Sequence, residues 1–459
     1  MDANWEARKE ALLAECQLAP EVFERVLPRL EVFMEPFVQN LARREQCEHA
    51  CTVVQGFLSD LERKNVESIA YRFGLERMPL QWFVGVSSWS HEPLRDELVR
   101  QVGETLGRAD GVIVFDPSGF PKSGKNSVGV ARQWCGRLGK TDNCQVAIYM
   151  GYVSCEEHAL VDTRLYLPEE WAKDRPRRKK AGVPKTVRFR TRHELCLEML
   201  AHNGPQLPHA WIAGDDEMGR PYWFRRSLCE LGERYLLAVP SNTQIRDIEV
   251  EPPAYGGSGR PPQSPWTRVD RWKEALAEDA WTTIDVRDGA KGPLIAEIVS
   301  RRVIGRTDKR RAGHDEMLVV IRYQDRDHMR VVKTDYYLSN ASPETTLAEF
   351  ARVAKAEHRI EECIQRAKSE AGLADYEVRN WRGWHHHQIL SLIASWFLVT
   401  EARRGKKIDP SVDRAASSAR HQCNPPPRLP VRASRTHRPR TPTTTHPQRT
   451  RSPLPLEAA

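Results

Sequence analysis

A short apolar run that ends in an acid constrains this chain more than any other feature of its sequence. Val112-Ile113-Val114-Phe115 is typical of a buried strand, and Asp116 follows it directly, with the turn-forming residues Pro117-Ser118-Gly119 behind. Asp215 holds the same position after a second apolar run, 209–214. Because strand ends in a mixed sheet present side chains to a shared crevice, we expect the two acids to lie close together.

The runs around these acids predict the element order β-β-β-α-β-α-β. Three consecutive strands with short links favour an antiparallel meander, and the helices that follow favour crossover connections. The predicted strands are 112–115, 144–153, 158–167, 209–214 and 235–239, and the predicted helices are 192–202 and 222–231. The sequence therefore predicts an α/β fold built on a mixed sheet.

The flanking segments follow other patterns. Residues 1–107 space apolar residues at three and four, which indicates helices. Residues 241–340 are strand-rich with Pro-, Gly- and Ser-rich loops, and helices are predicted again over 343–372 and 384–400. From residue 406 the chain is rich in Pro and Arg and too polar to pack, so we expect a disordered tail over 406–459.

The net charge of +8 is unevenly distributed. Residues 411–459 hold nine Arg and two acids, so nearly all of the excess lies there and global charge is weak evidence for nucleic acid binding. No apolar run approaches the roughly 18 residues of a membrane span, and residues 1–6 do not resemble a signal peptide. We expect a cytoplasmic protein with reduced, structural cysteines.

The run His385-His386-His387 suggests metal ligands at first sight. Consecutive residues on a helix point in different directions, so packing or surface roles are the better interpretation.

A third acid completes a candidate metal site. Glu361 lies in the helical stretch from Ile360 to Lys368. Three converging carboxylates repel one another unless cations neutralise them, and oxygen ligands suit Mg²⁺ or Mn²⁺. Two such ions about 4 Å apart can activate an attacking oxygen and stabilise a leaving oxygen in phosphodiester cleavage.

On these residues the chain resembles the DDE transposases of bacterial insertion sequences, members of the ribonuclease-H-like superfamily. The resemblance runs from about residue 20 to residue 400. It is carried by the segments 112–120, 214–219, 337–340 and 360–362, together with Lys368.

The resemblance implies a helical DNA-binding domain over 1–107 and a catalytic domain that begins over 108–240. It further implies a β-rich insertion over 241–340 and C-terminal helices over 341–405 that complete the catalytic domain. The 146 residues between Asp215 and Glu361 suit such an insertion.

The resemblance also implies the site and the reaction. Asp116, Asp215 and Glu361 would bind two Mg²⁺ or Mn²⁺ ions, and Lys368, seven positions after Glu361, would steady a phosphate. Hydrolysis at the element ends would be followed by transfer of the 3′-hydroxyl into target DNA. A homodimer on paired ends, associated with the bacterial nucleoid, is implied as well.

Several alternatives remain open at the residue level. Asp216 adjoins Asp215 and Glu362 adjoins Glu361; the apolar run before Asp215 and the spacing to Lys368 favour the first of each pair. Ala354 and Glu357 replace the aromatic residue and the arginine of the family signature. A catalytically decayed transposase that acts as a DNA-binding protein is therefore the alternative function.

The loop after Asp116 allows two interpretations. Residues 119–125 fit the nucleotide-binding pattern G-x-x-x-x-G-K, but Asn126 replaces its metal-binding hydroxyl. We favour contacts to DNA phosphates, against a merely solvated basic loop. The candidate DNA-binding residues are Lys122, Lys125, Arg132, Arg137 and Lys140.

Overall fold

The computed structural model describes residues 20–259, 261–289, 292–324 and 331–409. The predictions for residues 1–19 and for the tail beyond residue 409 lie outside these ranges. Residues 406–408, assigned to the tail from sequence, belong instead to the last helix, α14 (Trp381–Ile408).

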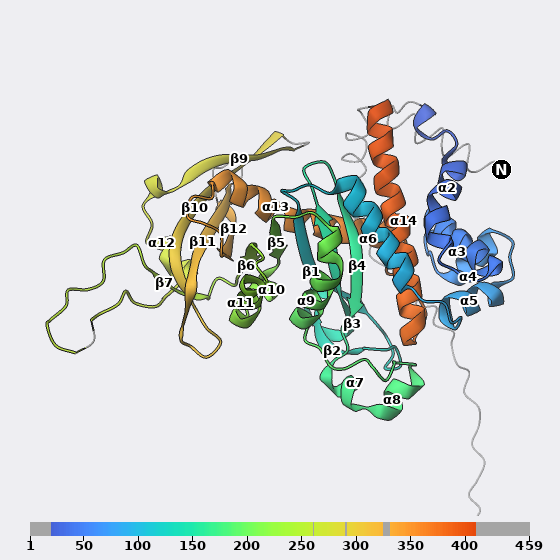
Figure 1. Cartoon of the computed structure of the whole chain (residues 1–459), viewed down its shortest axis with the longest axis horizontal. Helices are drawn as coiled ribbons and strands as arrows, with labels where there is room; N and C mark the ends of the chain where they lie inside the picture. The colour runs from blue at the N-terminus through green and yellow to red at the C-terminus, as the bar shows by residue number, and fades with distance from the viewer. Residues whose placement is uncertain (1–19, 260, 290–291, 325–330, 410–459) are drawn as a thin grey trace, which may run out of the picture.

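The N-terminal segment is helical, as predicted, over its described residues. Most of its helices lie on the far side of α14 from the central sheet, whereas the last of them lies beside α14 and packs directly on the sheet (Figure 1). Buried aromatic side chains such as Phe37, Phe57 and Phe83 form their core. The helices are α2 (Val26–Val38), α3 (Arg44–Phe57), α4 (Val66–Arg72), α5 (Arg77–Gly85) and α6 (Glu92–Leu106).

The middle of the chain forms the mixed α/β sheet that the sequence predicts. β1 pairs antiparallel with β3 and parallel with β5, and β5 pairs parallel with β6. The strands are β1 (Val112–Pro121), β2 (Ala131–Cys135), β3 (Lys140–Val153), β4 (His158–Leu165), β5 (Trp211–Gly214) and β6 (Tyr235–Ala238). The helices between them are α7 (Glu169–Lys173), α8 (Arg175–Lys180), α9 (Arg192–Asn203), α10 (Asp216–Gly219) and α11 (Tyr222–Glu230).

The turn predicted at Pro117-Ser118-Gly119 is wrong, because β1 continues through these residues to Pro121. β3 pairs with β1 along its whole length, including Pro117 opposite Ile148. β5, on the other edge, ends opposite Phe115. Beyond that point one edge of β1 has no ladder, and such an edge tolerates a residue without an N–H group.

The strands predicted over 241–340 are present, and they extend the same sheet. β12 pairs antiparallel with β6, with Tyr337 opposite Ala238, so the described sheet is continuous across both regions (Figure 1). The elements are β7 (Gln244–Asp247), β8 (Thr267–Arg268), α12 (Val269–Glu274), β9 (Thr282–Gly289), β10 (Gly292–Arg306), β11 (Ala312–Gln324) and β12 (Val331–Ser339).

Helix α13 (Leu347–Glu370) packs directly on this sheet. A Cβ atom added at Gly151 of β3 would lie 2.2 Å from Cδ1 of Ile360, so the glycine allows the helix its close approach. Ile360, Ile364 and Ala367 are buried in the contact. No helix in the described ranges combines the length and apolar content that a membrane crossing needs.

The three histidines of α14 are buried, as the packing interpretation predicts. The ring of His386 stacks on Trp89, and Nε2 of His387 lies 2.8 Å from the carbonyl oxygen of Gly372. Burial lowers the pKa of His385 to about 3 and the pKa of His386 and His387 to about 4. These imidazoles are therefore neutral in the folded protein at neutral pH.

We expect the His387→Gln variant to lose less stability in acid than the wild-type protein. Below pH 6.5 the unfolded chain binds more protons than the folded one, so the stability supplied by a buried neutral histidine falls as the pH approaches 4. For His387 this loss is about 2 kcal/mol between pH 7.5 and pH 5. Urea unfolding at both pH values measures this loss of stability. An equal loss in the wild type and the variant would contradict the conclusion that His387 is buried in its neutral form.

Candidate active site

The register between β1 and β5 places two acids side by side. Phe115 and Gly214 form the last pair of this parallel ladder, and Asp116 and Asp215 are the next residues of each chain segment. Neighbouring strands lie about 4.8 Å apart, so both carboxyl groups emerge at one point of the sheet. Asp215 also caps the short helix α10, and its Oδ1 accepts a hydrogen bond from the backbone N–H of Met218 at 3.0 Å.

Both acids are held in an environment that disfavours their charged form. Burial, followed by the charges of Asp215 and Glu361, raises the pKa of Asp116 well above its usual value. Burial also raises the pKa of Asp215 to about 7, although the hydrogen bond from Met218 opposes the shift. Without a nearby cation, the pair resists carrying two negative charges at neutral pH.

Helix α13 brings Lys368 to the same place. Its Nζ donates a hydrogen bond to Oγ of Ser118 at 2.6 Å and lies 5.0 Å from the ring centre of Phe120. Ser118 is two residues beyond Asp116, so the two side chains share one face of β1. The charge of Lys368 opposes the rise in the pKa of Asp116, in keeping with this proximity.

The structure adds an acid that the sequence did not assign to the site. Glu357 lies one helical turn before Glu361, and its pKa is raised well above the usual value by burial and then by the charge of Asp215. Glu361 instead has a 59% exposed side chain and lies 3.4 Å from Nδ1 of His358. The hydrogen bond from His358 lowers the pKa of Glu361. The i, i+4 spacing of Glu357 and Glu361 places both on one face of a helix, and this pattern in the sequence could have indicated that Glu357 lies near the site.

Asp216 and Glu362, the sequence neighbours of Asp215 and Glu361, each lie beside a cationic or imidazole side chain. Asp216 is 56% exposed, and its carboxylate accepts a hydrogen bond from Arg220 at 3.3 Å. Glu362 is 27% exposed and lies 3.9 Å from Nε2 of His358.

The donor set fits a divalent cation in its chemistry. Asp116, Asp215, Glu357 and Glu361 offer the carboxylate oxygens that Mg²⁺ and Mn²⁺ prefer. A cation would also remove the repulsion that raises the pKa of Asp116. Within the described ranges, however, no three His, Cys, Asp or Glu side chains are close enough together to hold an ion as they stand. Glu361 would have to turn away from His358 to join the two aspartates.

The predicted DNA-binding residues fall into two groups. Lys125, Arg132, Arg137 and Lys140 are exposed. Lys122 is half-buried, with Nζ 3.6 Å from the ring centre of Tyr376, and burial lowers its pKa to about 8. The segment 122–130 contains no helix, which agrees with the rejection of a nucleotide-binding loop.

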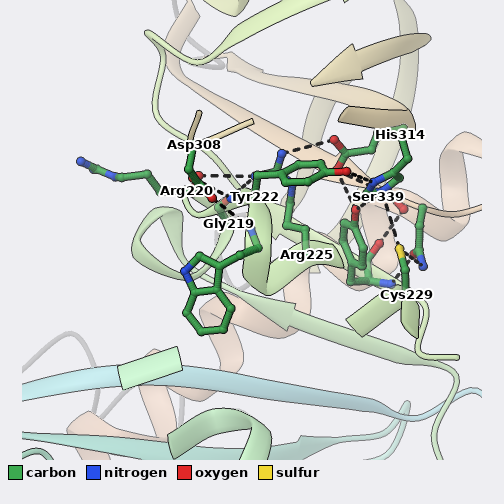
Figure 2. A network of polar contacts seen from close by, with 12 residues as sticks. Gly219, Arg220, Tyr222, Arg225, Cys229, Asp308, His314 and Ser339 are labelled. Atoms are coloured by element: carbon green, nitrogen blue, oxygen red, sulfur yellow. Dashed lines mark hydrogen bonds and ion pairs between the residues drawn. The ribbon is translucent and has the colours of Figure 1, made fainter. Parts of the chain in front are cut away.

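A buried polar network connects the Asp215 segment to the strands that follow (Figure 2). Arg225 of α11 donates hydrogen bonds from Nε to Glu316 of β11 at 2.8 Å and from Nη1 to the carbonyl oxygen of Gly219 at 2.6 Å. The side chains of Arg225 and Glu316 are 2% and 0% exposed. Tyr235 donates a further hydrogen bond to Glu316 at 2.6 Å. The end of α10 is thereby fixed to the sheet.

The same network caps α11 from a distant part of the chain. Asp308, in the turn between β10 and β11, accepts hydrogen bonds from the backbone N–H groups of Tyr222 and Trp223 at 3.1 and 3.2 Å (Figure 2). On the other side of α10, Arg192 of α9 donates to the carboxylate of Glu217 at 2.6 Å. The segment that follows Asp215 is thus held from both flanks.

Two acids just beyond a parallel ladder, with further carboxylates on a helix nearby, are the arrangement that the resemblance to DDE transposases implies. Residues 36–293, more than half of the chain, match the family described as DDE superfamily endonuclease. The chain belongs to this family, which confirms the resemblance seen in its sequence.

The chain is also similar to a protein named probable transposase for insertion sequence element IS701, from Microchaete diplosiphon. The two are 34% identical over 195 residues, which cover 41% of this chain and 48% of the relative. The chain therefore spans about half the length of the curated relative that it matches.

We expect Arg225→Met to destabilise the protein by about 3–5 kcal/mol, because it leaves the carboxylate of Glu316 buried without its cation. The double variant Arg225→Met/Glu316→Leu should recover most of this loss, since no buried charge remains. Guanidinium unfolding followed by tryptophan fluorescence measures both. If the double variant is no more stable than the single one, the ion pair is not the source of the effect.

Proposed function

We propose that this protein is a DNA transposase that cuts the ends of its element and joins them to target DNA. In the first step a water oxygen attacks the phosphorus atom at the element end, and the 3′ oxygen leaves as a hydroxyl group. In the second step that 3′-hydroxyl attacks a phosphodiester of the target, and a new 3′-hydroxyl is released there.

The observation that carries this proposal is the pairing of Asp116 with Asp215 at the end of the β1–β5 ladder. Two carboxylates with raised pKa values, each one residue beyond the last pair of the β1–β5 ladder, suit cation binding better than a structural role. The family points the same way, since DDE superfamily endonucleases generally use divalent metal ions.

Asp116, Asp215 and Glu361 would hold two Mg²⁺ or Mn²⁺ ions. When bound, such ions lower the pKa of the attacking hydroxyl group and stabilise the leaving oxygen. Lys368 donates a hydrogen bond to Ser118, two residues beyond Asp116, and would contact a non-bridging phosphate oxygen. Its ammonium group would oppose the charge that develops during the displacement.

The identity of the third carboxylate has two candidates on α13. Glu361 has the family spacing to Lys368, and its exposed side chain can turn toward the aspartates. Glu357 is the more buried group, and its pKa is already raised by Asp215. We propose Glu361 as the ligand and Glu357 as a neighbouring acid that adds to the negative potential of the site.

The remaining assignments concern DNA and assembly. The helical segment 1–107 would recognise the terminal inverted repeats, and the exposed cations Lys125, Arg132, Arg137 and Lys140 would contact phosphates beside the site. A homodimer would hold two element ends together. The proposed domain limits are 1–107, 108–240 and 241–340, followed by C-terminal helices from residue 341 to the end of α14 at residue 408.

The second candidate function is a DNA-binding protein without nuclease activity. Two observations favour it: Ala354 and Glu357 replace signature residues, and Glu361 is turned toward His358. Binding to the element ends without cleavage in Mg²⁺ or Mn²⁺ would support this candidate and reject the first.

We expect Asp116→Asn, Asp215→Asn and Glu361→Gln each to reduce cleavage by more than about a hundredfold, which is the upper limit for loss of a residue that only hydrogen-bonds to a metal ligand. The measurement is cleavage and strand transfer of oligonucleotide duplexes that carry the DNA flanking the coding sequence, with Mg²⁺ or Mn²⁺. Binding of the same duplexes in EDTA should persist, because the acids do not attract phosphate.

The adjacent acids provide matched controls. Asp216→Asn and Glu362→Gln remove one negative charge from the same segments and should cleave like the wild type. Glu357→Gln separates the two glutamates: a greater loss in this variant than in Glu361→Gln would reassign the third ligand. Full activity in Asp116→Asn or Asp215→Asn would reject the site itself.

A further inference from the structure

An exposed tryptophan lies on the edge strand β2. Side chains alternate along a strand, and here Gln133 and Cys135 face the protein, whereas Arg132 and Trp134 face outward. The side chain of Trp134 is 55% exposed, and Leu138, just beyond the strand, is 40% exposed. A single exposed apolar side chain is ordinary. The surroundings of Trp134 are what make it informative.

The two neighbours of Trp134 fix it to both acid-bearing segments. Gln133 accepts a hydrogen bond from Nη2 of Arg192 at 3.2 Å, and Arg192 pairs with Glu217, two residues after Asp215. Cys135 packs on Gly119, three residues after Asp116: a Cβ added at Gly119 would lie 2.9 Å from its Sγ. The hairpin of β2 and β3 is therefore held in a defined position relative to the candidate active site.

Three of the exposed side chains in the segment around Trp134 are cationic. Arg132, Arg137 and Lys140 are all exposed, and Lys140 pairs with Asp142 at 3.1 Å. Among the described residues, neither Arg132 nor Arg137 forms an ion pair, although the charge of Arg132 helps to lower the pKa of Asp142. Arg137 lies close enough to Lys368 to disfavour its charged form. An aromatic ring surrounded by cations in this way suits a nucleic acid strand, whose phosphates neutralise the cations and whose bases offer flat faces.

We propose that Trp134 stacks on an unpaired base of DNA next to the phosphodiester that is cut, while Arg132 and Arg137 contact the flanking phosphates. This inference rests on the proposed function. In an intact duplex both faces of each base are covered by its neighbours, so an indole on a fixed hairpin can stack only where a base has left the helix or an end has opened. The ligand is therefore locally melted DNA at the reaction centre.

The test is equilibrium binding of the full-length protein in EDTA, where no cleavage takes place. Two duplexes of one sequence carry a fluorescent adenine analogue, paired in one and opposite an abasic site in the other. We expect the wild type to bind the unpaired form more tightly and to quench its fluorescence. Trp134→Ala should bind the unpaired form about tenfold more weakly and lose the quenching, with affinity for the paired duplex unchanged.

Trp134→Phe retains a flat ring and should keep part of the preference. Tyr255→Ala removes an aromatic side chain of similar exposure (52%) from the loop between β7 and β8 and should behave like the wild type. The inference is overturned if Trp134→Ala retains the preference for the unpaired base, or if it weakens both duplexes equally. If the wild type binds neither duplex, the proposed DNA-binding function fails and this inference fails with it.

Discussion

The parallel ladder between β1 and β5 brings the two candidate metal ligands, Asp116 and Asp215, together. Four residue pairs, from Val112 opposite Trp211 to Phe115 opposite Gly214, hold the two segments in register. The ladder ends at the point where each segment continues with an aspartate. Both carboxyl groups are then withdrawn from water beside each other, and each pKa rises. A site of this kind is incomplete by its own electrostatics, because it can be fully charged only when cations are present.

The surrounding contacts hold the two aspartates together although their negative charges repel each other. Lys368 supplies one positive charge beside Asp116 and is itself held by Ser118. The segment after Asp215 is fixed by Arg192 on one flank and by Arg225 on the other. Because Arg225 is paired with Glu316 of β11, the strands that extend the sheet also help to position the second aspartate. The insertion is thus part of the framework of the site as well as an extension of the sheet.

Local patterns predicted most of the strands and the place of Asp116 directly after a buried apolar run, since the run and the acid are adjacent in the sequence. What failed depended on partners far away in the sequence. The turn at Pro117 was wrong because β3 continues to pair with β1 there, and the sequence of β1 does not reveal its partner's length. Glu357 was passed over because its burial depends on how α13 sits on Gly151. For His386 of α14 the sequence left packing and surface roles open together, and its burial depends on the contact with Val84 of α5.

The two glutamates of α13 occupy opposite electrostatic situations, and together they suggest how the site would respond to cations. Glu361 is held by an exposed contact with His358, and contacts of that kind contribute only about 0–1 kcal/mol. Glu357 is partly buried and favours its neutral form. An incoming cation can therefore draw Glu361 from His358 at little cost, whereas Glu357 and the aspartates would release protons as the cation binds. Cation affinity should then rise with pH through the range near 7 in which Asp215 titrates, so that proton release and assembly of the carboxylates are two aspects of one event.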